Sequence, residues 1–306
     1  MSRRVLITGG SGFIGTQLAA ALKQSGWQIT VLSRSPQAAQ QKQQNGYAYA
    51  ASLAELNDAA PFDLVVNLAG ASVGEGRWTA ERKRELTASR VGTTKALAAW
   101  LHERTWQPKL VISGSAVGYY GNALGGASDA ADESGVAQPL FVSTLCQQWE
   151  AAAAPIAEQS GIPLAIVRLG VVFGHGGGIL PQLLLPLKWN LAGKIGSGRQ
   201  PLVWIHMADV IGAMLWLVEH PQTGKHVYNL VAPELVSQAE FAAEAAKQLG
   251  RTPIFSVPAP FVRLLMGEQA DLVLGGRFVV PKALQAAGYH FRFPTLAAAL
   301  RDLLHG

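Results

Sequence analysis

The chain has 306 residues, of which 49% are hydrophobic and 15% are charged, so it can bury a sizeable core in one large or two small domains. No uninterrupted apolar stretch reaches the ~18 residues that a membrane-spanning helix needs. The single cysteine, Cys146, excludes an internal disulfide. The first predicted strand begins within four residues of the start, which leaves no room for a signal peptide. We therefore expect a cytoplasmic protein that binds no membrane.

The formal net charge is +5, but the basic residues are scattered along the chain, apart from Arg82-Lys83-Arg84 on a predicted helix. We interpret this trio as a solvated helix face rather than a nucleic-acid site. We therefore expect no nucleic-acid partner.

The chain opens with three short patterns in succession. An apolar run, Val5-Leu6-Ile7, leads directly into the glycine-rich segment Thr8–Gly15, and the amphipathic stretch Thr16–Lys23 follows. This order predicts a strand, a turn and a helix. In that context spaced glycines indicate a dinucleotide-binding site. The alternative is an ordinary turn between a strand and a helix.

Each glycine of this turn has a distinct expected role in cofactor binding. Gly9 allows a tight turn, Gly12 lets the backbone approach a pyrophosphate, and Gly15 lets the helix pack closely on the sheet. The helix start at Phe13 and Ile14 offers unpaired N–H groups to the phosphates.

The first half of the chain alternates apolar runs with helical patterns, which predicts a parallel sheet built from βαβ units. Its strands lack a strict period of two, as expected when both faces of a sheet are covered. The predicted strands are Arg4–Thr8, Gln28–Ser33, Leu64–Leu68, Leu110–Ser113 and Leu164–Leu169. The predicted helices are Thr16–Ser25, Thr79–Arg104 and Leu140–Ser160, with a polar helix or loop at Gln37–Gln44.

The pattern changes after about residue 174, so residues 1–174 are predicted to form a Rossmann-like, doubly wound α/β domain that binds the dinucleotide. Residues 175–306 are predicted to form a smaller, substrate-side domain, with residues 202–232 returning to the first. Ligands of open α/β sheets bind beyond the carboxyl ends of the strands, so the second domain should cap that edge. Its expected elements are a strand at Leu202–Ile205, helices at Ala208–Glu219 and Ala239–Leu249, a strand near Ile254–Val257, and helices near Phe261–Met266, Lys282–Ala287 and Leu296–Leu304.

The residues after the second strand indicate which cofactor is bound. An NAD site usually places an acid there to bind the ribose hydroxyls. This strand ends instead in Leu32-Ser33-Arg34-Ser35. A guanidinium and a hydroxyl would bind a 2′-phosphate, so Ser33 and Arg34 predict NADP(H). The alternative is that Arg34 is only a surface residue.

The glycine spacing G-x-x-G-x-x-G in Thr8–Gly15 resembles that of extended short-chain dehydrogenases/reductases, which include nucleotide-sugar epimerases and dehydratases. Asn67-Leu68-Ala69-Gly70 is similar to the N-x-A-G motif of that superfamily, whose backbone lies along the adenosine ribose. Val111–Gly121 resembles its fifth-strand segment, with one residue inserted. The resemblance implies that Ser115 is the catalytic hydroxyl, while Ser113 closes the strand and contacts the cofactor.

The resemblance also implies a Tyr-x-x-x-Lys pair on the following helix, where the tyrosine moves a proton and the lysine lowers its pKa. This chain has Phe141 and Leu145 at those positions, and neither can transfer a proton. The remaining acid–base candidates are Tyr119, Tyr120 and His206. Cys146 is more typical of a small buried hydrophobic residue than of a nucleophile.

Several motifs together resemble one branch of this superfamily, the epimerase family proteins with an added C-terminal domain. For that branch the resemblance implies that Ser33, Arg34, Leu68, Ala69, Glu85 and Arg90 contact NADP, and that Cys146 lies by the nicotinamide ribose. The motifs are Arg77-Trp78-Thr79, Ser89-Arg90, Ser113–Gly121, Trp149-Glu150, Gly176–Gly178, Gly196–Gly198, Trp204-Ile205-His206 with Asp209, Leu265–Glu268 and Tyr289–Pro294.

The second half offers candidates for a substrate pocket. Gly174–Gly178 follows the sixth strand and permits close backbone approach, or forms a flexible loop. Arg199 would bind a substrate phosphate or form an ion pair, and His206 is a second substrate candidate. Asp209 is most simply a carboxylate in the first turn of a helix. No cluster has metal-ligand spacing, so we expect no metal.

These observations predict an NADP(H)-binding protein that acts as an oxidoreductase or epimerase on a carbonyl, alcohol or nucleotide-sugar-like small molecule. The alternative is a catalytically silent NADP(H)-binding regulator that acts through a protein partner. Many members of the superfamily dimerise through two helices, which implies a homodimer through Thr79–Arg104 and Leu140–Ser160.

Overall fold

A seven-stranded parallel sheet forms the centre of the computed structural model, which describes residues 3–37, 40, 46–122, 125–253 and 255–306. Its strand order is β10-β6-β5-β4-β1-β2-β3. The strands are β1 (Arg4–Thr8), β2 (Gln28–Leu32), β3 (Ala48–Ala50), β4 (Leu64–Asn67), β5 (Leu110–Ala116), β6 (Leu164–Leu169) and β10 (Lys225–Leu230). The doubly wound, Rossmann-like α/β fold predicted from the sequence is confirmed.

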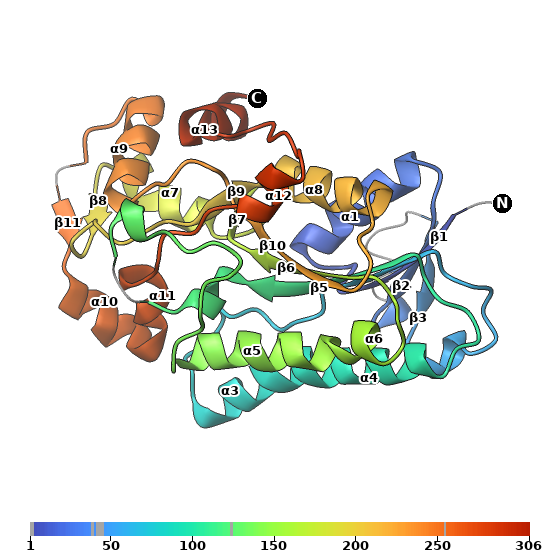
Figure 1. Cartoon of the computed structure of the whole chain (residues 1–306). Coiled ribbons are helices and arrows are strands. Elements are labelled where there is room, and N and C mark those ends of the chain that lie inside the picture. Colours follow the sequence, from blue (N-terminus) through green and yellow to red (C-terminus); the bar gives the residue numbers. More distant parts are fainter. Residues whose placement is uncertain (1–2, 38–39, 41–45, 123–124, 254) are drawn as a thin grey trace.

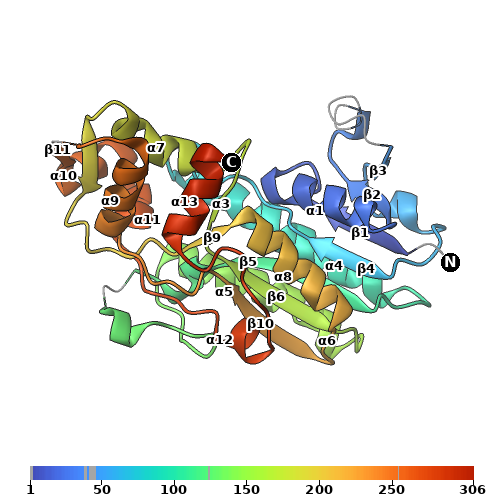
Figure 2. The ribbon, with the colours of Figure 1, turned by 90° about the horizontal axis from the view of Figure 1, so that it is seen from above.

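Helices cover both faces of this sheet (Figures 1 and 2). Val5 and Ile7 of β1 join one core cluster, while Leu6 joins another, because successive side chains of a strand point to opposite faces. Both faces are therefore buried, which explains why the central strands β1, β4 and β6 are mostly apolar. The helices are α1 (Phe13–Gln24) and α8 (Met207–Glu219) on one face, and α4 (Thr93–His102), α5 (Phe141–Ala153) and α6 (Pro155–Glu158) on the other.

Two of the predicted helices are interrupted in the structure. The stretch Thr79–Arg104 forms α3 (Ala80–Thr87), a wider π turn η2 (Ala88–Gly92) and then α4. The stretch Leu140–Ser160 forms α5 and α6, and the second helix begins at Pro155. Proline is favoured at a helix start because its missing N–H has no acceptor there.

The sequence prediction missed the two strands at the sheet edges, β3 and β10. Strand β3 has only three residues. Strand β10 begins with the exposed residues Lys225 and His226, and its buried second half includes the polar residue Asn229, so neither strand shows a clear apolar run. The polar segment Gln37–Gln44 lies mostly outside the described residues.

Most of the second part of the chain lies beyond the carboxyl ends of the central strands, but α12 (Lys282–Ala286) packs against β10 of the main sheet (Figure 1). It has its own core around Phe173, Trp204, Phe241 and Leu300. The strand predicted at Leu202–Ile205 begins two residues later, as β9, and pairs with β7 outside the main sheet. Its elements are β7 (Val171–Phe173), α7 (Leu180–Lys188), β8 (Ala192–Ile195), β9 (Trp204–His206), α9 (Gln238–Leu249), β11 (Phe255–Val257), α10 (Ala259–Met266), η5 (Gly267–Ala270), α11 (Asp271–Leu274), α12 (Lys282–Ala286) and α13 (Leu296–His305). The short turns η1 (Ala54–Leu56), η3 (Val117–Tyr120) and η4 (Ala127–Asp129) belong to the first part.

Candidate cofactor and active site

The glycine-rich turn between β1 and α1 is shaped by close backbone contacts. Gly9 has φ +71°, and a Cβ added there would lie 2.5 Å from the Leu68 carbonyl oxygen. A Cβ on Gly15 would collide with the Gly9 carbonyl oxygen. At Gly12 the nearest atom is that same oxygen at 3.2 Å, and no other atom is close. Two glycines are therefore required by packing, and the third leaves open space beside the helix start.

The N-terminus of α1 can receive an anion. Gly12 is the N-cap residue, no side chain caps the helix, and the first turn holds no acidic residue. Helix geometry leaves the N–H groups of Phe13 and Ile14 without acceptors inside the helix. Free N–H groups and the helix dipole favour a phosphate at this position. The residues present therefore fit the pyrophosphate of a dinucleotide.

The glycines after β7 pack against the side chain of Phe13. A Cβ on Gly177 would lie 2.6 Å from the Phe13 ring, and one on Gly178 would lie 2.9 Å from it. Gly174 meets the same ring at 3.1 Å. The close approach that these glycines allow is therefore to Phe13, which links them to the glycine-rich turn.

Ser33 and Arg34 follow the carboxyl end of β2, on the edge of this site. Arg34 is exposed and forms no hydrogen bond or ion pair with the part of the chain that the structure describes. The Ser33 hydroxyl oxygen accepts a hydrogen bond from the Ser35 N–H at 3.3 Å. A guanidinium free to bind is thus present at the position where an NAD site has an acid.

Leu68 and Ala69 lie in the loop after β4, which two residues of the π turn hold in place. Arg90 Nη2 donates to the Ala71 carbonyl oxygen at 2.9 Å, and the Ser89 hydroxyl oxygen accepts from the Ala71 N–H at 3.1 Å. A Cβ on Gly70 would lie 2.9 Å from the Arg90 guanidinium carbon. Burial lowers the pKa of Arg90. Arg90 therefore positions the loop that carries Leu68 and Ala69.

Glu85, which the resemblance assigns to the cofactor, has a side chain that is 55% exposed on α3. It forms an ion pair with Arg82 at 2.6 Å. Lys83 pairs with Glu268 of the second part of the chain. Two members of the basic trio are therefore neutralised by carboxylates of this same chain.

Ser115 is buried, and its hydroxyl donates to Glu150 Oε1 at 2.6 Å. A serine has one hydroxyl proton, so in this arrangement Ser115 cannot also donate to a substrate oxygen. Ser113 is fully buried on β5, and its hydroxyl oxygen lacks a hydrogen-bond partner among the described residues.

Glu150 belongs to a buried ion pair that sequence reasoning missed. Its carboxylate accepts two hydrogen bonds from Arg168 of β6, each at 2.8 Å. Burial lowers the pKa of Arg168, but the hydrogen bonds and charge of Glu150 more than offset this and raise it. The signal was available in the sequence, because an arginine inside an apolar strand requires a buried partner.

The adjacent tyrosines differ in their surroundings. Tyr120 is fully buried, donates to Asn229 Oδ1 at 2.7 Å and accepts from Arg168 Nη1 at 2.8 Å. Burial raises its pKa to about 12, and both hydrogen bonds of its hydroxyl are made within the protein. Tyr119 is partly exposed, and the Arg168 guanidinium carbon lies 3.5 Å from the centroid of its ring.

The two positions of the expected Tyr-x-x-x-Lys pair are packed with other side chains. The Phe141 ring lies edge-on to Trp78, with centroids 5.2 Å apart, and Leu145 is only 4% exposed. Cys146 is also buried, and burial followed by the Glu150 charge raises the pKa of its thiol to about 11. A thiol protonated at neutral pH is not a nucleophile.

The structure places the two predicted substrate residues differently. Arg199 is exposed and forms no ion pair among the described residues. His206, the second predicted substrate residue, is buried: it caps α8 by accepting from the Ala208 N–H, and its Nε2 lies 3.3 Å from Asp302. Asp209, in the first turn of α8, is fully buried and accepts hydrogen bonds from backbone N–H groups near the C-terminus.

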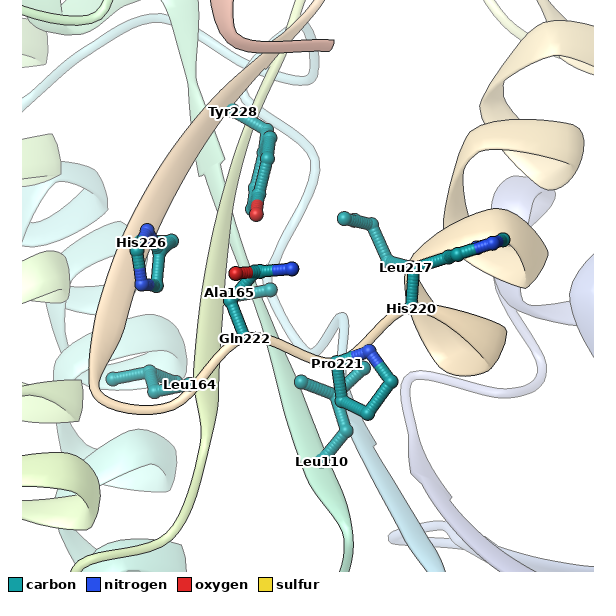
Figure 3. A pocket seen from close by; sticks show the side chains of 9 residues that line it. All are labelled: Leu110, Leu164, Ala165, Leu217, His220, Pro221, Gln222, His226 and Tyr228. Carbon is teal, nitrogen blue, oxygen red and sulfur yellow. The ribbon is translucent and has the colours of Figure 1, made fainter. Parts of the chain in front are cut away.

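Figure 3 shows a cavity at the amino ends of β5, β6 and β10, on the edge of the sheet opposite the glycine-rich turn. Its volume is about 10 Å³, which is room for one water molecule at most. This cavity cannot hold a substrate. It is lined by Leu110, Leu164, Ala165, Leu217, His220, Pro221, Gln222, His226 and Tyr228.

Within the described residues, no group of three or more His, Cys, Asp or Glu side chains could hold a metal ion. The same residues include no helix that is long and apolar enough to cross a membrane.

Known proteins similar to this chain share both its halves. An epimerase family protein of Staphylococcus saprophyticus is 35% identical over 304 residues, which cover 99% of this chain and 100% of that protein. Its counterpart in Staphylococcus aureus strain MRSA252 is 35% identical over 303 residues, with 99% of each chain covered. The crystal structure of the human epimerase family protein SDR39U1 with NADPH has a TM-score of 0.87, 35% identity and 98% coverage of both chains.

A nucleoside-diphosphate sugar epimerase of Corynebacterium glutamicum has a TM-score of 0.77 and 27% identity over 99% of this chain, which spans 58% of that protein. Residues 257–303 match a domain of unknown function, DUF1731. Residues 5–230 match the family described as NAD dependent epimerase/dehydratase. With this match and the full-length similarity of its relatives, the chain belongs to the NAD-dependent epimerase/dehydratase family.

Proposed function

We propose that the protein is an NADP(H)-dependent oxidoreductase that acts on a carbonyl or alcohol of a small molecule, nucleotide sugars included. One observation carries the proposal: Tyr119 is partly exposed after the carboxyl end of β5, with the Arg168 guanidinium 3.5 Å from its ring. A tyrosine beside a fixed cation is the combination that the missing pair on α5 would otherwise supply.

NADP(H) is favoured over NAD(H) by the residues around the end of β2. Arg34 is exposed there and unpaired within the described chain, and no acid stands where it would repel a 2′-phosphate. The similar human protein was solved with NADPH. The pyrophosphate would lie at the N-terminus of α1, beside Gly12.

When bound, the cofactor supplies or accepts the hydride. The Tyr119 phenol exchanges a proton with the substrate oxygen, and Arg168, which lies against its ring, holds the tyrosine in position. Glu150 holds the guanidinium in position through two hydrogen bonds. Ser115 donates to Glu150 and so helps to orient it.

A catalytically silent regulator that binds NADP(H) is the second candidate function. Three observations favour it: Ser115 is 1% exposed, Tyr120 is fully buried, and Cys146 is buried with a raised pKa. Under this alternative Tyr119 would have no role in proton transfer.

Oxidation of NADPH, followed by absorbance with a panel of aldehydes, ketones and UDP-sugars, separates the two functions. The enzyme proposal expects turnover, and Tyr119→Phe should lower kcat by about a hundredfold or more, the usual contribution of a general acid. Tyr228→Phe, at a buried tyrosine of β10 whose side chain lines the small cavity of Figure 3, is the matched control and should not change kcat. Tight NADPH binding without turnover of any compound would favour the regulator.

A further inference from the structure

The loop between β4 and α3, residues 68–79, contacts both the glycine-rich turn between β1 and α1 and the C-terminal domain, residues 257–303. At the start of the loop, the Leu68 carbonyl oxygen packs against Gly9. Arg90 and Ser89 then form hydrogen bonds with the backbone of Ala71. The loop therefore links the cofactor site to the residues that bind its second half.

The second half of the loop is bound by the C-terminal domain. Gln269 is 6% exposed, and its side-chain Nε2 donates to the carbonyl oxygens of Val73 at 3.0 Å and Gly76 at 2.7 Å. In return, Arg77 Nη2 donates to the two carbonyl oxygens of Leu264-Leu265 at the end of α10, each at 3.2 Å. One buried amide thus holds both ends of a short turn, and one guanidinium holds a helix end. We call these two sets of hydrogen bonds the C-terminal anchor.

Phe141, at the position of the missing tyrosine, packs beneath this anchor. Its ring contacts Trp78, whose Nε1 donates to the Val73 carbonyl oxygen at 3.0 Å. Lys83 lies 5.1 Å from the same ring centroid and forms an ion pair with Glu268, next to Gln269. The aromatic ring at position 141 therefore supports the loop and its contact with the C-terminal domain.

We infer that the C-terminal domain, residues 257–303, sets the affinity for NADP(H) by holding the β4–α3 loop in its binding conformation. This inference rests on the proposed binding of NADP(H). None of the anchoring residues needs to touch the cofactor. A loop already ordered before binding costs less entropy when the ligand arrives, so loss of the anchor weakens binding. By linkage, bound cofactor must stabilise the anchor to the same extent.

Gln269→Ala tests the inference by titration of NADPH fluorescence. We expect affinity to fall about tenfold, which corresponds to ~1.4 kcal/mol. Gln248→Ala is the matched control, because its Nε2 also donates to a backbone carbonyl, that of Ala297 at 2.9 Å, but entirely within the second part of the chain. The control should bind NADPH as the parent does.

Arg77→Met removes the other half of the anchor. It keeps the inference testable if Gln269→Ala does not fold. Its far-ultraviolet circular dichroism is compared with that of the parent, and we expect the same loss of affinity. Parental affinity in folded Gln269→Ala and Arg77→Met would overturn the inference while leaving the proposed function intact. A parent protein that does not bind NADPH would instead overturn the proposed function, and this inference with it.

Hydrogen exchange provides a second readout that needs no substrate. NADPH should slow amide exchange in α10 and η5 of the parent and of Gln248→Ala, but much less in Gln269→Ala. Equal protection in all three proteins would contradict the linkage between the cofactor and the C-terminal domain.

Discussion

Glu150→Gln should destabilise the protein strongly, because it leaves the Arg168 guanidinium buried without a counter-charge. The Arg168 side chain is 4% exposed and that of Glu150 is 14% exposed, so solvent cannot replace the lost carboxylate. Removal of one partner of a buried ion pair costs about 3–5 kcal/mol. An unfolding entropy of ~2.1 cal/mol/K per residue gives about 0.6 kcal/mol per degree for 306 residues. The melting temperature should therefore fall by roughly 5–8 °C.

The assay is thermal unfolding followed by circular dichroism, with Glu158→Gln as the control. Glu158 pairs with Lys225 at 3.2 Å, but both side chains are largely exposed, so its loss should cost no more than about 1 kcal/mol. The Glu150 charge is also the second cause of the raised pKa of Cys146, so the thiol should titrate at lower pH in Glu150→Gln. Equal melting temperatures for the two variants would refute the argument that Glu150 compensates a buried charge.

Four further outcomes are expected from the structure. Gly12→Val should abolish NADPH binding, measured by fluorescence titration, without unfolding the protein, since its side chain would fill the space beside the α1 N-terminus. Arg34→Asp should weaken NADP(H) by at least about tenfold relative to NAD(H) in the same titration, because a carboxylate repels the 2′-phosphate. Burial lowers the pKa of His206, so the stability that the neutral imidazole contributes is complete above pH ~6.5 and is lost as the pH falls. His206→Gln should therefore flatten the decline in melting temperature between about pH 7 and pH 5. Phe141→Tyr combined with Leu145→Lys should not create NADPH-dependent carbonyl reduction, because a lysine at the buried position 145 tends to lose its proton, and appearance of turnover in the compound panel would show this reasoning to be wrong.

The central sheet was predictable because each central strand can be recognised from the pattern of its own residues. Mostly apolar runs such as Leu164–Val167 are expected where helices cover both faces, and β1 and β6 have the predicted bounds. The edge strand β10 escaped prediction because one half of it faces solvent. The break in Thr79–Arg104 escaped it too, since a π turn has no strong signature in the side chains that form it.

The candidate site was predictable only where backbone geometry determines residue type. Gly9 and Gly15 are fixed by contacts of their own turn and its neighbour, which any dinucleotide fold of this kind needs. The N-cap role of His206 was not predicted, because histidine is an uncommon residue at that position of a helix. The anchor formed by Gln269 and Arg77 could not be predicted, because each bonds backbone atoms nearly 200 positions away.

The tyrosine–cation combination at this site comes from the sheet rather than from helix α5. Ser115 and Arg168 are register partners on the neighbouring strands β5 and β6, and Tyr119 lies in the turn η3 that directly continues β5. The spacing between the guanidinium and the Tyr119 ring therefore depends on the pairing of two buried strands. A shift of one residue in that pairing would turn Arg168 to the other face of the sheet. The bidentate bond to Glu150 opposes such a shift, so the same ion pair that stabilises the fold also keeps the cation beside Tyr119.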